Sequence, residues 1–220
     1  MPYIKRTLPF LGLCISILIM TACVSNKSES FGTIIILNGP SAVGKSSIIK
    51  AFQDKQDTPW LGMGIDNLFI GVVSMKFLFD PGYKVMQGFP TEDAGGKLFT
   101  LHIGSEGQKI IKGMHRAIAA YARAGNNVIV DYIAYDPTWI TDLQSSLQGI
   151  NTIYVGVTAS LETIQQREKS RGTSPEGHGR SLYESVHKGW NYNLKIDTDA
   201  LTPDQVADLI AQYLKHSSNS

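Results

Sequence analysis

The sequence predicts a three-layer α/β fold in which a five-stranded parallel sheet carries helices on both faces. Three observations lead to this prediction. Short apolar runs typical of buried strands alternate with amphipathic segments typical of helices from Gly32 onward. A glycine-rich phosphate-binding string lies directly between the first apolar run and its helix. The chain has 220 residues, which fits one domain after a short leader.

The first predicted elements come from apolar runs and the segments between them. Thr33–Asn38 reads TIIILN, a continuous apolar run as expected for a parallel strand that is buried on both faces. A helix over Lys45–Gln53 follows, and Trp60–Ile65 is a second short strand that ends at Asp66. We expect a further helix over Asn67–Lys76.

The alternation continues through the second half. Glu106–Ala124 is a strong helix, because its apolar residues recur on one face and Gly125 is a typical stop signal. The remaining predicted elements are the strand Val128–Val130, the helix Pro137–Leu147, the strand Thr152–Val157, the helix Leu161–Ser170, the strand Leu194–Ile196 and a last helix from Pro203 to about Lys215.

Two stretches interrupt this pattern and are predicted as long loops. Phe77–Ser105 is rich in glycine and aromatic residues, and Arg171–Arg180 is rich in glycine, serine and charge. Loops of this length inside a compact domain are usually functional. Both are expected to flank the ligand-binding edge of the sheet.

Composition excludes several classes of protein. The chain is 43% hydrophobic with a net charge of +1, so it is not a disordered chain. Its 20 basic and 19 acidic residues argue against a nucleic-acid partner bound through bulk charge. Cys14 and Cys23 are the two cysteines, and both precede the domain. The folded part therefore contains neither a disulfide nor a thiolate metal site.

The N-terminus has the layout of an export signal. Lys5 and Arg6 form a short basic region, and Leu8–Met20 is an uncharged, mostly apolar run that is too short to span a bilayer as a stable helix. The string MTAC that ends at Cys23 resembles a bacterial lipoprotein processing box. It predicts an exported or membrane-attached lipoprotein whose contact with the membrane is made only through a lipidated Cys23.

The chain is accordingly divided into a leader over residues 1–22, a polar tether over 23–31 and a domain over 32–220. The alternative is that translation begins at Met20 or nearby and that the protein is cytoplasmic. ATP-dependent chemistry in the domain would favour that alternative.

The most specific motif is the string GPSAVGKS, which fits the phosphate-binding loop pattern G-x-x-x-x-G-K-[ST]. Successive backbone N–H groups of such a loop surround phosphate, while Lys45 reaches the β- and γ-phosphates and the Ser46 hydroxyl binds Mg²⁺. The predicted ATP-binding residues are Gly39, Pro40, Ser41, Ala42, Val43, Gly44, Lys45, Ser46 and Ser47.

Two acids end neighbouring apolar runs near this loop. Asp131 follows the strand Val128–Val130, an arrangement typical of a carboxylate that holds Mg²⁺. Asp66 is placed to accept the proton of an attacking hydroxyl. Either acid could instead cap the helix that follows it, and for Asp66 the two interpretations are equally good.

Arg167 and Arg171 lie four residues apart and therefore share a helix face beside the loop Arg171–Arg180. Guanidinium groups that close over a transferred phosphate exclude water and stabilise its charge. We predict this lid role, with a solvated, salt-bridged helix containing Glu162, Glu168 and Lys169 as the alternative.

Several strings together resemble the chloramphenicol phosphotransferase-like family of P-loop kinases. They are IIILNGPSAVGKSSI, PWLGMGIDNL, GMHRAIAAYARAGNNVIVD, IYVGV and QREKSRG, with VH and DTD further on, and they span about Ile34–Leu214. The resemblance implies a shikimate-kinase-like P-loop kinase fold that transfers the γ-phosphate of ATP to a hydroxyl of a small molecule such as chloramphenicol. It further implies that Asp66 is the catalytic base and that Arg167 and Arg171 contact ATP.

The sequence departs from the family pattern at two places. Tyr132 follows Asp131 where the family typically has a second acid, and the stretch Phe77–Ser105, which should help to form the acceptor pocket, differs in length and content. The reaction type is thus better predicted than its substrate. A non-catalytic nucleotide-binding protein at the membrane and a nucleoside or nucleotide kinase are the alternative functions.

Overall fold

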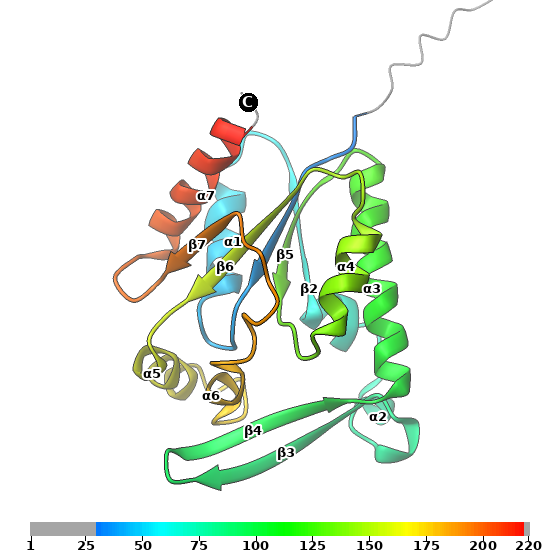
Figure 1. Ribbon diagram of the computed structural model, residues 1–220, viewed down its shortest axis with the longest axis vertical. Coiled ribbons are helices and arrows are strands. Elements are labelled where there is room, and N and C mark those ends of the chain that lie inside the picture. Colours follow the sequence, from blue (N-terminus) through cyan, green and yellow to red (C-terminus); the bar gives the residue numbers. More distant parts are fainter. Residues whose placement is uncertain (1–29, 218–220) are drawn as a thin grey trace, which may run out of the picture.

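The computed structural model describes residues 30–217 and shows a parallel five-stranded sheet between two layers of helices (Figure 1). The predicted fold class is confirmed. The leader, most of the tether and the proposed lipidation site at Cys23 lie outside the described residues. The strands are β1 (Ile34–Asn38), β2 (Trp60–Gly64), β5 (Asn127–Tyr132), β6 (Thr152–Thr158) and β7 (Leu194–Asp197), in the order β2-β5-β1-β6-β7.

Strand β1 lies at the centre of the sheet, where it pairs in parallel with β5 and β6. Ile34 and Ile36 pack into the core on one face, and Ile35 and Leu37 pack into the core on the other. All four side chains are fully buried. This two-sided burial explains why the strand is continuously apolar instead of alternating.

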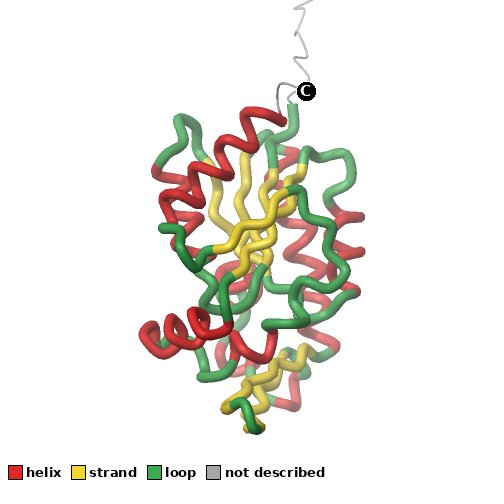
Figure 2. Tube along the Cα trace, turned by 60° about the vertical axis from the view of Figure 1, so that its left-hand side comes forward, coloured by secondary structure: helices red, strands yellow, loops and turns green. Residues whose placement is uncertain are grey.

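Each face of the sheet is covered by its own helices, as the two views show (Figures 1 and 2). One core cluster joins the sheet to α1 (Lys45–Asp54), α5 (Leu161–Arg171) and α7 (Pro203–Ser217). The other joins it to α3 (Ser105–Arg123) and α4 (Thr138–Ser146). Within residues 30–217, no helix is long and apolar enough to cross a membrane.

The helix predicted over Asn67–Lys76 is wrong. The segment forms one π-helical turn over Asp66–Ile70 and, further on, the short helix α2 (Met75–Leu78). The side chain of Asn67 accepts a hydrogen bond from the backbone of Gly64 and donates one to Gly62, so it binds back to β2 rather than supporting a helix.

Neither of the two predicted long loops is irregular throughout. The first contains a short 3₁₀ turn (Pro81–Tyr83) and an antiparallel hairpin of β3 (Met86–Asp93) and β4 (Gly96–Ile103). The second leads into α6 (His178–Leu182). Both do flank the carboxyl ends of the parallel strands, at the lower edge of the sheet in Figure 1. This is the edge where open α/β sheets bind their ligands.

Candidate active site

A cavity of about 1140 Å³ lies at this edge of the sheet. Its lining residues fall into two groups by the elements that carry them. The phosphate half comes from the loop between β1 and α1, from Asp131, from α5 with the segment that follows it, and from the segment between β7 and α7. The acceptor half comes from the π-helical turn, the residue after α2, the hairpin, α3, the loop after β5 and the starts of α4 and α6. It includes Phe69, Phe79, Phe99, Leu101, Ile133 and Trp139.

The predicted phosphate-binding loop lies between a buried strand and a helix, as its motif requires. Gly44 has a φ of 105°, a left-handed conformation that glycine adopts without strain, and it ends the loop at the first turn of α1. A Cβ at Gly39 would lie 2.4 Å from the carbonyl oxygen of Val157, so the start of the loop passes too close to β6 for a larger residue. The glycines thus set the course of the loop.

Lys45, Ser46 and Asp131 meet directly beneath this loop. The Lys45 ammonium donates hydrogen bonds of 2.9 Å to the carbonyls of Gly39 and Pro40 and lies 3.3 Å from the Asp131 carboxylate. The Ser46 hydroxyl donates to the other oxygen of Asp131 at 2.9 Å. Burial lowers the pKa of Lys45, and the negative charge of Asp131 opposes that shift.

The donor set formed by Ser46 and Asp131 fits Mg²⁺. A hydroxyl and a carboxylate are hard oxygen ligands, and a Mg²⁺ held by one or two protein groups completes its shell with water and substrate phosphates. Asp131 lies within β5, several residues before α4 begins at Thr138, so it does not cap a helix. The helix-cap alternative for Asp131 therefore has no structural support.

Asp66 lines the same cavity at the end of β2. The π-helical turn that begins at Asp66 has no side-chain cap, and within residues 30–217 the exposed Asp66 carboxylate makes no hydrogen bond or ion pair. Its negative charge acts on Lys45 and on the Tyr135 hydroxyl. A solvated, unpaired carboxylate near the phosphate loop is free to accept a proton from a bound hydroxyl.

Arg167 and Arg171 both line the phosphate half but differ in their contacts. The Arg167 guanidinium donates to the carbonyl of Val43 at 3.2 Å and to the hydroxyl and carbonyl of Thr198 at 2.9 and 2.8 Å. It therefore connects the phosphate loop to the segment after β7. Arg171 is exposed and makes no hydrogen bond or ion pair within the described part of the chain, which leaves its guanidinium available for an incoming phosphate.

Glu168 has a role that the sequence did not predict. It is 4% exposed, and its two oxygens accept hydrogen bonds of 2.7 and 2.8 Å from the backbone N–H groups of Gly177 and Gly179. The carboxylate thus binds the backbone on both sides of His178. Spacing places Glu168 on a charged helix, and only the folded backbone of α6 supplies the partners that bury it.

The cavity also contains a neutral pair of aromatic side chains. The Tyr135 hydroxyl lies 3.0 Å from Nε2 of His178, and the two rings are parallel within 7°. Burial and the positive charge of Lys45 lower the pKa of His178 to about 4. Burial, reinforced by the charges of Asp66 and Asp131, raises the pKa of Tyr135. Both side chains are therefore uncharged at neutral pH.

The hairpin is fastened to the segment after α5. Arg180 donates to the carbonyl of Gly96 at 2.8 Å and forms an ion pair of 2.6 Å with Asp93. The Ser181 hydroxyl donates to the carbonyl of Phe99 at 2.7 Å. These contacts hold the hairpin against α6.

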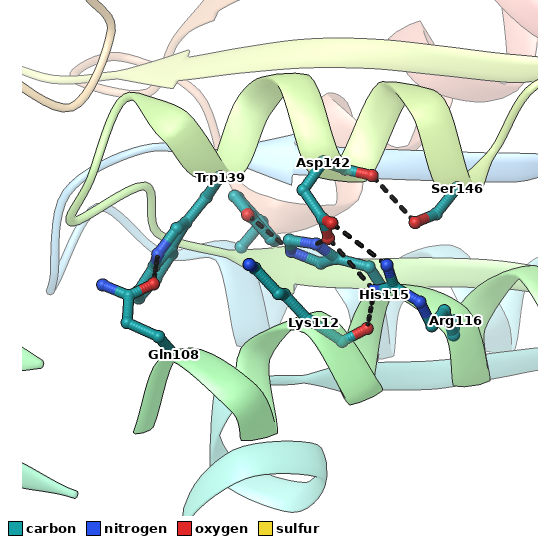
Figure 3. Close-up of polar contacts among 8 residues, drawn as sticks. Gln108, Lys112, His115, Arg116, Trp139, Asp142 and Ser146 are labelled. Atoms are coloured by element: carbon teal, nitrogen blue, oxygen red, sulfur yellow. Dashed lines mark hydrogen bonds and ion pairs between the residues drawn. The ribbon is translucent and has the colours of Figure 1, made fainter. Parts of the chain in front are cut away.

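Tyr132, which stands where a second acid was expected, points away from the cavity. It is fully buried, and its hydroxyl lies 2.9 Å from Nε2 of His115, whose Nδ1 lies 2.6 Å from Asp142. Asp142 also pairs with Arg116 at 3.2 Å (Figure 3). This chain of contacts anchors the end of β5, next to Asp131, to α3 and α4.

Comparisons with known proteins agree with this geometry. The family model described as "Chloramphenicol phosphotransferase-like protein" matches residues 32–215. A Mycobacterium tuberculosis protein named "Putative O-phosphotransferase" is 31% identical over 179 residues, which cover 80% of this chain and 79% of that protein.

Two solved kinases share the fold. The APS kinase of Mycobacterium tuberculosis, solved with AMPPNP and APS, is 15% identical with a TM-score of 0.56, and the match covers 84% of this chain and 98% of that one. The shikimate kinase of Acinetobacter baumannii, solved with shikimate, is 13% identical with a TM-score of 0.52, covering 86% and 96% of the two chains.

Proposed function

Because the chain belongs to the chloramphenicol phosphotransferase-like family and is a P-loop phosphotransferase, we propose that it transfers the γ-phosphate of ATP to a hydroxyl of an uncharged, largely apolar small molecule. The observation that carries this proposal is the single cavity shared by a complete phosphate-binding loop, an unpaired Asp66 and an aromatic acceptor half.

The class of acceptor follows from the charges in the cavity. Its three lysine or arginine residues, Lys45, Arg167 and Arg171, all lie in the phosphate half. Among the residues that line the acceptor half, none carries a positive charge at neutral pH, so an acceptor with its own phosphate or carboxylate has no cation to bind there. Apolar and aromatic side chains instead favour a neutral body with a hydroxyl directed at Asp66.

The residues divide the chemistry as follows. Asp66 accepts the proton of the acceptor hydroxyl. The oxygen of that hydroxyl forms a bond to the γ-phosphorus as the bond from the γ-phosphorus to the bridging oxygen of the β-phosphate breaks. Lys45 and Arg171 stabilise the charge on the phosphoryl oxygens, and ADP leaves. Ser46 and Asp131 would hold Mg²⁺, which when bound supplies further positive charge to the β- and γ-phosphates.

The two alternative functions find less support. A non-catalytic nucleotide-binding protein would not need Asp66, Lys45, Ser46 and Asp131 to gather at one cavity. A nucleotide kinase would need cations in the acceptor half for the phosphate of its acceptor, and the residues that line that half supply none. A nucleoside carries no phosphate, so a nucleoside kinase falls within the proposed class of neutral acceptors.

The test is a transfer assay with the full chain, γ-labelled ATP and Mg²⁺ on two sets of alcohols. The neutral aryl alcohols include chloramphenicol, and the anionic set includes shikimate and GMP. We expect label to move to at least one neutral alcohol, with a product heavier by one phosphoryl group, and this transfer to be lost in Asp66→Asn. Transfer confined to the anionic set, or to no compound at all, would refute the proposal.

A further inference from the structure

Tyr135 and His178 come from separate parts of the chain and meet in the wall of the cavity. Tyr135 lies in the loop after β5, and His178 begins α6. Each lines the cavity, and their polar atoms are 3.0 Å apart. Their neighbours in the acceptor half include Phe99, which meets His178 edge to face, and Trp139, which meets Tyr135 edge to face. Apart from Asp66, this part of the wall is otherwise apolar.

Counting hydrogens shows what the pair can offer a ligand. The tyrosine has one O–H and the neutral imidazole has one N–H, and their mutual hydrogen bond uses one of these two hydrogens. Within residues 30–217 neither side chain has a further hydrogen-bond partner. Whichever tautomer is present, the pair itself leaves one donor unused. The pair therefore presents a hydrogen-bond donor without a charge.

The backbone around His178 is held in place by three sets of contacts. A side chain that only filled space would not need its backbone to be fixed in this way. Glu168 binds the backbone N–H groups before and after it. A Cβ at Gly179 would lie 2.5 Å from Ile164 and 3.0 Å from the carbonyl of Ser41, so the backbone passes closely over the phosphate loop. On the other side, the carbonyl of Gly177 accepts a hydrogen bond from the N–H of Phe99 in the hairpin. The ring is thus held at the junction of the two halves.

We propose that Tyr135 and His178 act together as the polar recognition group of the acceptor half, donating one hydrogen bond to an uncharged oxygen of the acceptor and so directing its reactive hydroxyl toward Asp66. This inference rests on the proposed transfer to a neutral alcohol and adds the group that selects it. It places both residues in contact with the acceptor and neither in contact with the transferred phosphate.

The test measures binding, so that it does not depend on turnover. The full chain is saturated with ADP and Mg²⁺, and the dissociation constants of two neutral probes, chloramphenicol and 1-phenylpropane-1,3-diol, are measured by calorimetry. Tyr135→Phe and His178→Leu each leave one donor but remove the partner that holds it in place, whereas His178→Gln keeps a polar partner for the Tyr135 hydroxyl. Tyr121→Phe, at an exposed tyrosine on α3, is the matched control.

We expect Tyr135→Phe and His178→Leu to weaken binding of at least one probe roughly tenfold, because the remaining donor is no longer held toward the acceptor and about one hydrogen bond is lost. His178→Gln should recover part of this affinity, Tyr121→Phe should not alter it, and ADP should bind equally to all variants. If His178→Leu does not fold, Tyr135→Phe decides the outcome alone.

Three results would overturn the inference: neither probe binds the wild type, both probes bind Tyr135→Phe as tightly as the wild type, or ADP affinity falls in parallel with probe affinity. If the probes bind with the expected losses but no alcohol is phosphorylated, the proposed function fails and this recognition role stands.

Discussion

Replacing Glu168 should loosen the junction between α5 and the start of α6. In Glu168→Ala, the N–H groups of Gly177 and Gly179 lose their only described acceptor. A buried donor left unpaired costs about 1–3 kcal/mol, so two cost about 2–6 kcal/mol. Removing the buried carboxylate also relieves part of its desolvation cost, which brings the expected loss to about 2–4 kcal/mol. Glu168→Gln keeps one acceptor oxygen and should lose about half as much.

The free energy of unfolding in urea measures the global effect, and hydrogen exchange at the Gly177 and Gly179 amides measures the local one. If α6 detaches while the rest stays folded, the free energy of opening measured by exchange at these two amides will fall more than the free energy of global unfolding. Glu162→Ala is the matched control, because Glu162 lies on the same helix but is exposed. It should change stability by less than about 0.5 kcal/mol. A Glu168→Ala protein with equally small loss and still-protected amides would refute the reasoning.

Four other outcomes are expected. Lys45→Ala should lower phosphoryl transfer by about a thousandfold or more with an unchanged circular dichroism spectrum, and near-normal turnover would contradict the phosphate-loop assignment. Asp66→Asn should abolish transfer yet leave ATP affinity, measured by calorimetry, nearly unchanged; a parallel loss of ATP binding would instead place Asp66 in the Mg²⁺–phosphate site. The unfolding free energy should fall as pH drops from about 6.5 to about 4, because over this range His178 binds a proton in the unfolded state but, with its pKa lowered to about 4, not in the folded state. His178→Gln should make the unfolding free energy less dependent on pH. Cys23→Ala should release the protein from the membrane fraction of its own host, whereas a soluble wild type whose N-terminal peptide begins at an unmodified Met20 would contradict the lipoprotein prediction.

The parallel sheet and the phosphate loop could be predicted because their signals are local. TIIILN is mostly apolar because β1 is buried on both faces, and the glycines of the string GPSAVGKS determine the backbone conformation of the phosphate-binding loop. The hairpin was missed although KLFTLHI alternates and follows two glycines, a typical hairpin signal. The glycines and aromatics around it favoured a loop over the whole stretch from Phe77 to Ser105.

The site could be predicted only as far as strand ends and helix faces reveal it. Asp66 and Asp131 end neighbouring strands, so their proximity to Lys45 follows from the topology. Glu168 and His178 could not be found in this way. Their roles depend on backbone N–H groups and a tyrosine that only the folded chain brings to them, and a glutamate on a charged helix usually faces water.

The two-part cavity has a consequence for how this protein can evolve. From Phe99 onward, every second residue of β4 lines the cavity, namely Phe99, Leu101 and Ile103, while none of the residues that handle phosphate belongs to the hairpin. Substitutions on that strand can therefore reshape the range of alcohols accepted without altering the machinery of transfer. A mutant library restricted to these positions, selected on new alcohols, should yield altered specificities from one inherited reaction.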